Sequence, residues 1–162
     1  MMARDKKVVI ALGNRFRGDD AIGPTVADLL VGRLDNCAIL EGQDDAMAIL
    51  NAWEGAELAV VVDAASSDAP VGTIHRLDNF TMTVAKDLAR CSSHGVGLVE
   101  AIELSKALGC LPAQLVIYAV EAKSFETGAP LSPEVEEVAG AVVRQIVAEV
   151  MSSALPEEAS HA

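Results

Sequence analysis

The sequence is poor in aromatic residues and in positive charge. Its 162 residues include three Phe, one Tyr and one Trp, and 12 Lys and Arg stand against 24 Asp and Glu, a net charge of −12. Lys and Arg cluster nowhere, so the chain lacks the basic patch that binding to nucleic-acid phosphates requires. With so few aromatics, the core must be built from Val, Leu, Ile and Ala, which is typical of a sheet buried on both faces.

Cysteines and long apolar runs are also scarce. Cys37, Cys91 and Cys110 have no CxxC spacing, so we expect reduced, mostly buried thiols with structural roles in a cytoplasmic protein. No apolar run approaches the length of a membrane span. The first apolar run is interrupted by Asn14 and Arg15, which favours a strand over a signal peptide.

The pattern that is present alternates strands with helices. Apolar runs predict strands over 8–13, 37–42, 58–65 and 114–122, with an edge strand over 73–78. Helical patterns predict a first helix that ends at about Leu34, and others over 45–55, within 92–109 and over 131–151. We therefore expect a three-layer α/β/α sandwich, with a mostly parallel, mixed sheet of about five strands flanked by helices. The length favours a single domain over 1–162, with its core at about 8–151 and a disordered tail at 154–162.

Polar residues follow several of these strands. In sheets of this type, ligands bind beyond the carboxyl ends of the strands, so acids and a histidine that are distant in sequence can converge on one rim. The candidates at this rim are Asn14, Asp19, Asp20, Glu41, Gln43, Asp63, His94 and Glu121.

Asp20, Asp63 and His94 form the most informative combination. Taken singly, each has a plain structural explanation, as a helix cap, the end of a strand and a partner for a helix turn. Together, two carboxylates and an imidazole suit a divalent transition metal, and the imidazole favours nickel, zinc or copper over magnesium. Two carboxylates alone also suit an acid/base pair that shares one proton. The residues by themselves leave both alternatives open.

Other catalytic patterns are absent from the sequence. The glycines after the first strand do not form GxGxxG, and the chain has no GxxxxGK[ST] and no HExxH. Ser92 and Ser93 adjoin His94, but they are not part of a GxSxG elbow. We expect His75 and His161 to be surface residues rather than ligands.

Four segments, in this order and spacing, resemble the [NiFe]-hydrogenase maturation endopeptidases. They are LGNRFRGDDAIG, VVVDAASSDAPVGTIHRLD, SSHGVGLVEAIELSKALGCLP and YAVEAKSFETGAPLSPEV, and the resemblance runs from about Val8 to Val150. It implies an endopeptidase that removes a short C-terminal peptide from the precursor of a hydrogenase large subunit after nickel insertion. It also implies that Asp20, Asp63 and His94 bind this nickel, which the substrate carries, and that the enzyme has no tightly bound metal of its own. Asp19 then serves the end of the helix while Asp20 faces the metal.

The sequence departs from the family pattern at two positions. Ala21 replaces a glycine and would strain the turn if the position needs φ > 0, and Ala119 replaces another glycine in the last strand. Two other functions are considered: a non-catalytic metal or chaperone module that binds the immature subunit, and a nucleotide-binding domain in which Glu41 binds a ribose. We expect a monomer that binds neither nucleic acid nor membrane, and we assign no single nucleophile.

Overall fold

A five-stranded sheet forms the centre of the computed structural model, which describes residues 6–43, 45–78, 86–89 and 92–152. The strands follow the spatial order β2-β1-β3-β5-β4. Their bounds are β1 (Lys7–Ala11), β2 (Ala38–Glu41), β3 (Leu58–Ala65), β4 (Ile74–Leu77) and β5 (Gln114–Glu121). All pairs are parallel except β4 with β5, so the mixed, mostly parallel sheet predicted from the sequence is confirmed.

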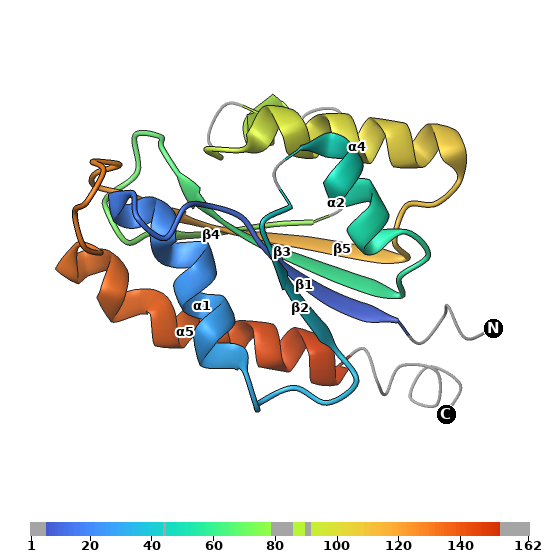
Figure 1. Cartoon of the computed structure of the whole chain (residues 1–162), viewed down its shortest axis with the longest axis horizontal. Coiled ribbons are helices and arrows are strands. Elements are labelled where there is room, and N and C mark those ends of the chain that lie inside the picture. The colour runs from blue at the N-terminus through green and yellow to red at the C-terminus, as the bar shows by residue number, and fades with distance from the viewer. Residues whose placement is uncertain (1–5, 44, 79–85, 90–91, 153–162) are drawn as a thin grey trace.

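Helices cover both faces of this sheet (Figure 1). One layer holds α1 (Ile22–Leu30) and α5 (Pro133–Ser152), and the other holds α2 (Ala46–Trp53) and α4 (Gly95–Leu108). Each layer packs its apolar side chains on one face of the sheet and so forms its own core. The arrangement is the predicted three-layer α/β/α sandwich.

The central strand β3 is buried along its whole length because it pairs with β1 on one side and β5 on the other. Its alternate residues enter the two cores, which explains why it reads as one continuous apolar run. Since β1, β3 and β5 are parallel, their carboxyl ends meet at one edge of the sheet. The loops that follow these strands are therefore neighbours at that edge.

Several predicted boundaries differ from the structure. The first helix ends at Leu30 rather than Leu34, because Val31 leaves the helical region (φ −58, ψ 127) and Gly32 has φ 84. A 3-10 helix that the pattern did not predict, η2 (Gly18–Ala21), leads directly into α1. Asp63 does not end its strand, since β3 continues to Ala65.

The prediction of mostly buried cysteines is wrong for two of the three, because Cys37 and Cys110 are half-buried. Both are free thiols, and burial is the main cause that raises the pKa of Cys37. Cys91, His161 and the predicted tail at 154–162 lie outside the described residues.

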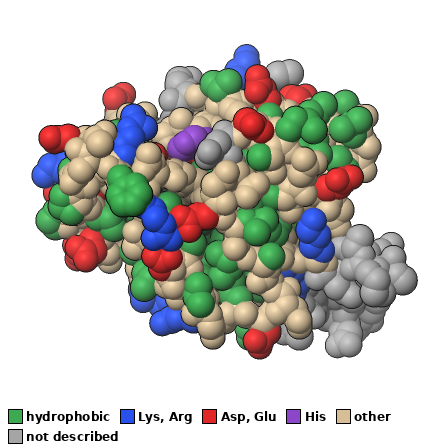
Figure 2. Space-filling model, in the orientation of Figure 1, with side chains coloured by type: hydrophobic (Ala, Val, Ile, Leu, Met, Phe, Trp, Pro, Cys, Tyr) green, Lys and Arg blue, Asp and Glu red, His purple; other side chains and the backbone are tan. Residues whose placement is uncertain are grey.

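The helices in the described part of the chain do not combine the length and the apolar composition that a bilayer-spanning segment needs. Acidic side chains are spread over the face seen in Figure 2 and are interspersed with Lys and Arg. The negative charge on this face is therefore distributed rather than gathered in one patch.

Candidate metal centre

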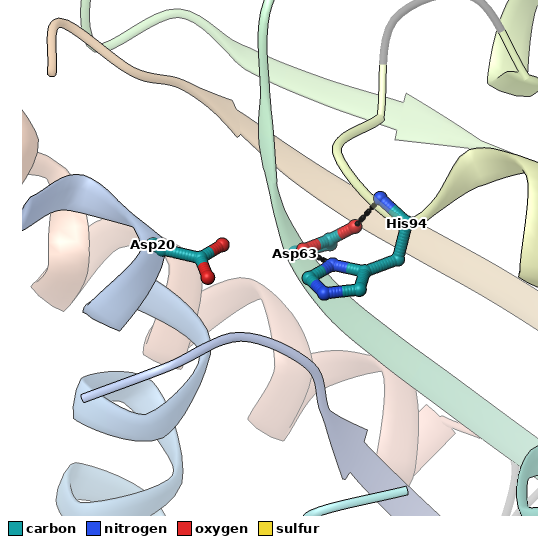
Figure 3. A group of neighbouring side chains, drawn as sticks. All are labelled: Asp20, Asp63 and His94. Atoms are coloured by element: carbon teal, nitrogen blue, oxygen red, sulfur yellow. Dashed lines mark hydrogen bonds and ion pairs between the residues drawn. The ribbon is translucent and has the colours of Figure 1, made fainter. Parts of the chain in front are cut away.

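Asp20, Asp63 and His94 come together at the carboxyl edge of the sheet (Figure 3). One possible ligand atom from each lies within 4.8 Å of the others. Asp20 belongs to η2, Asp63 to β3, and His94 directly precedes α4, so three separate segments build the group. Asp20 is 1% exposed and Asp63 0%, whereas the His94 side chain is 29% exposed. Solvent therefore reaches the group at the imidazole rather than at the carboxylates.

Hydrogen bonds hold the Asp63 carboxylate through both of its oxygens. Oδ1 accepts from the Ala64 N–H at 2.8 Å and from the Ser93 hydroxyl at 3.1 Å, and it lies 2.9 Å from His94 Nδ1. Oδ2 accepts from the Ser92 hydroxyl and, at 2.9 Å, from the His94 N–H. These donors compensate the carboxylate for its complete burial and fix its orientation.

The contact between His94 and Asp63 determines which ring nitrogen carries the proton. A carboxylate only accepts hydrogen bonds, so the 2.9 Å contact places the proton on Nδ1. An ion shared by Asp63 and His94 would have to take the place of this proton, because the two ring nitrogens point in different directions and Nδ1 is the one that faces the carboxylate.

Asp20 is held from the loop that follows β1. Its Oδ2 accepts from the Asn14 N–H at 2.9 Å and lies 3.8 Å from Arg17 Nη1, while Oδ1 lies 3.5 Å from the Ser93 hydroxyl. The loop after β1 can approach the backbone of Asp20 this closely because Gly13 has no side chain. Gly13 has φ +123, and a Cβ on it would lie 2.0 Å from the Asp20 carbonyl oxygen.

Asp19 does not serve the end of α1 as predicted. Its buried carboxylate turns away from the helix and accepts from the backbone N–H groups of Lys123, Ser124 and Ser132 at 2.7–3.2 Å. The Ser132 hydroxyl donates to both of its oxygens. Asp19 therefore fastens the η2 loop to the segment between β5 and α5. No local pattern indicates this role, because the partners lie more than 100 residues away along the chain.

The two departures from the family pattern cause no strain. Ala21 has φ −79, so the turn does not need a glycine at this position. Ala119 is fully buried in β5 and is paired in register with Asp63.

Glu41, which ends β2, and Gln43, which follows it, do not join the group. Glu41 accepts two hydrogen bonds at 2.8 Å from Arg15, which also pairs with Asp28 on α1. The side-chain amide of Gln43 donates to the Glu41 carbonyl oxygen. Glu41 thus anchors the loop after β1, which leaves no structural support for it as a ribose ligand.

Glu121 is the centre of a second buried cluster, beside the antiparallel strand β4. It accepts from the Ser67 N–H and hydroxyl, and the His75 Nε2 lies 3.0 Å from its Oε1. Burial of the carboxyl tends to raise its pKa, but the hydrogen bonds from Ser67 and His75 outweigh burial and hold the pKa below its ordinary value. His75 is therefore a half-buried partner of Glu121 rather than the predicted surface residue.

Sequence reasoning missed the contribution of Ser92 and Ser93. Both hydroxyls donate to Asp63, and Ser93 also lies 3.1 Å from His94 Nδ1. The available signal is their position directly before His94, where no serine-nucleophile motif is present. The pattern to look for is a Ser-Ser-His segment directly before a helix, together with an acid in a neighbouring strand.

The geometry favours a cation over a shared proton. Among the described residues, Asp20 and Asp63 form no direct hydrogen bond, and the Ser93 hydroxyl lies between them. Two buried carboxylates repel each other, and a divalent cation placed near both converts this repulsion into attraction. Two carboxylate ligands and one imidazole leave coordination positions open for groups from another molecule.

Comparisons with known proteins agree with this fold. The sequence model of a family described as "HycI: Hydrogenase maturation protease" matches residues 26–149. A hydrogenase expression/formation protein HupD from Thiocapsa roseopersicina is 24% identical over 134 residues, which are 80% of this chain and 61% of HupD. The chain therefore spans about three fifths of the length of that relative.

Two proteins that are named as hydrogenase maturation enzymes have solved structures with a similar fold. The hydrogenase maturating endopeptidase HybD from E. coli is 23% identical, with a TM-score of 0.79 over 91% of this chain and 93% of HybD. The [NiFe] hydrogenase maturation protease HybD from Thermococcus kodakarensis is 25% identical, with a TM-score of 0.72 over 87% of this chain and 96% of that protein.

Proposed function

The chain belongs to the hydrogenase maturation protease family, and from this premise we propose that it is an endopeptidase that removes the C-terminal extension of a [NiFe]-hydrogenase large subunit after nickel insertion. The convergence of Asp20, Asp63 and His94 within 4.8 Å is the observation that carries the proposal. The family match over 26–149 includes Asp63 and His94. Asp20 lies outside that segment, so its assignment depends on the fold, which brings it to the same place.

In this proposal, nickel arrives with the substrate and the three side chains recognise it. Carboxylates and an imidazole are suitable ligands for a divalent transition ion, and the group contains no thiolate. Three donors do not fill the coordination shell, which suits an ion that is already held by its own protein. A precursor without nickel would present no ion for the two buried carboxylates to bind. The protein would therefore recognise a precursor only after nickel has been inserted into it.

Cleavage then depends on what the bound ion does to the nearby peptide. A divalent transition ion can polarise a carbonyl group or lower the pKa of a bound water. Before the ion arrives, Asp63 orients the His94 ring through Nδ1, and the backbone N–H of Asn14 orients Asp20. We assign no covalent nucleophile, since an activated water meets the requirement of hydrolysis.

The experiment is incubation of the purified protein with a nickel-loaded large-subunit precursor, read by intact mass. Loss of one C-terminal peptide mass at catalytic protein concentrations supports the proposal. A stable complex with an uncleaved precursor would instead support the non-catalytic chaperone alternative. The Ser67→Ala variant is a suitable folded control, because Ser67 contacts Glu121 rather than the proposed nickel ligands.

A further inference from the structure

Ser93 is the side chain that connects the two halves of the site. Its Oγ lies 3.1 Å from Asp63 Oδ1, 3.1 Å from His94 Nδ1 and 3.5 Å from Asp20 Oδ1. Asp63 and His94 are also bonded to each other, whereas Asp20 is held from a different loop through Asn14. In the described part of the chain, Ser93 is the one residue with a side-chain contact to all three proposed ligands.

The hydroxyl has one proton to donate and two lone pairs to accept with. Since His94 Nδ1 carries a proton, the ring shares it between Asp63 at 2.9 Å and the Ser93 oxygen at 3.1 Å. The Ser93 proton then goes to a carboxylate. Asp63 is the nearer acceptor, and Asp20, at 3.5 Å, is the alternative acceptor. The hydroxyl can therefore follow whichever carboxylate oxygen the metal leaves available.

The exposure of Ser93 allows its hydroxyl to be removed without disturbing the core. Ser93 is exposed, although the two carboxylates beneath it are almost completely buried. An exposed hydroxyl contributes little to the core, so its removal should leave the fold intact. It also lies on the solvent side of Asp20 and Asp63, where the substrate's nickel must approach.

We infer that Ser93 is a positioning residue for recognition of the substrate's nickel: its hydroxyl sets the relative placement of Asp20 and the Asp63–His94 pair. The inference rests on the proposed function, and it goes beyond it by adding a residue that is not itself a proposed ligand. Outer-shell partners of this kind commonly change metal affinity or activity by roughly 10–100-fold when they are removed.

Ser67 provides a matched control. Like Ser93, it is an exposed serine whose hydroxyl bonds to a buried carboxylate, here Glu121 at 2.7 Å. Ser67→Ala therefore removes the same chemical group and the same kind of hydrogen bond outside the metal centre. Ser93→Thr keeps the hydroxyl and tests whether that group, rather than the size of the side chain, is responsible.

The test combines two measurements on the wild type, Ser93→Ala, Ser93→Thr and Ser67→Ala. Calorimetric titration of the isolated proteins with Ni²⁺ gives a Kd, and cleavage of nickel-loaded precursor gives kcat and KM. For Ser93→Ala we expect a Kd raised about tenfold and a kcat/KM lowered roughly 10–100-fold, mainly through KM. Ser93→Thr should recover most of both losses, and Ser67→Ala should stay within about twofold of the wild type.

Equal behaviour of Ser93→Ala and Ser67→Ala in both measurements would overturn the inference. Loss of kcat with unchanged Ni²⁺ affinity, together with labelling of Ser93 by a fluorophosphonate, would also overturn it, because Ser93 would then be a nucleophile. If the wild type fails to cleave the precursor, the proposed function fails, and the Ni²⁺ titration still decides whether Ser93 positions the ligands.

Discussion

The carboxylate of Asp19 accepts hydrogen bonds from both the backbone N–H and the hydroxyl of Ser132, which lies 113 residues further along the chain. This contact fastens the η2 loop to the residue that precedes α5. It also explains the two adjacent acids. Asp19 holds the loop in place, so that Asp20 can face the opposite way toward Asp63 and His94.

Asp19→Asn should therefore destabilise the fold. An amide in place of the carboxylate confronts the N–H groups of Lys123, Ser124 and Ser132 with a donor of its own, and at least one of these groups loses its partner. We expect the free energy of unfolding to fall by about 2–4 kcal/mol. Urea denaturation followed by circular dichroism measures it, and a change below about 0.5 kcal/mol would show that the contacts are not energetically important.

Asp20→Asn should have the opposite effect: it should abolish processing and leave stability nearly unchanged. The neutral amide removes the repulsion between two buried carboxylates and can still accept from the Asn14 N–H, so stability should be unchanged or slightly higher. Processing should fall at least about 100-fold, because a proposed nickel ligand is lost. Parallel denaturation and cleavage assays separate the two variants. Near-normal processing by Asp20→Asn would remove this residue from the proposed ligand set.

Arg17 should weaken cation binding. Its guanidinium lies 3.8 Å from Asp20 Oδ2 and stacks over Phe125, and its side chain is 49% exposed. Arg17→Gln removes both a competitor for Asp20 and a like charge beside the arriving ion. We expect the Kd for Ni²⁺ to fall roughly 2–5-fold, in line with the modest strength of exposed ion pairs. Arg15→Gln is the charge-matched control, since Arg15 pairs with Asp28 and Glu41. A higher Kd for Arg17→Gln would contradict this account.

Glu121 should make stability dependent on pH. Its pKa in the folded protein lies below its ordinary value of 4.5, since the bonds from Ser67 and His75 outweigh the effect of burial. The carboxylate thus contributes stability that is fully present above the unfolded pKa and is lost as the pH falls through the folded pKa. The stability difference between the wild type and Glu121→Gln should be largest near neutral pH and shrink below about pH 4.5. A difference that grows on acidification would reverse the sign that we assign.

Much of the fold could be predicted because its signals are local. The continuous apolar run of β3 and the stop of α4 at Gly109, which has φ 70, are encoded in short segments. The rim was predictable because parallel strands end on the same side. That rule placed Asp20, after β1, near Asp63, in β3, without any knowledge of side-chain contacts.

The parts that could not be predicted depend on partners distant in sequence. Asp19 reads as a helix cap until Ser132 is seen beside it, and His75 reads as a surface residue until Glu121 is seen beneath it. The role of Ser93 could not be predicted for a different reason. Its importance lies in being near three groups at once, and no spacing within one segment reveals that.

The most direct test of the central claim is intact-mass analysis of a nickel-loaded and a nickel-free precursor, each incubated with protein that has been chelated and desalted. We predict that the nickel-loaded precursor loses its C-terminal peptide and that the nickel-free precursor keeps it. A third sample adds Zn²⁺ to the protein and omits nickel from the precursor, and it should also remain uncut. Robust cleavage in that third sample would contradict the account, because the protein would then act as an ordinary zinc peptidase that does not recognise its substrate's nickel.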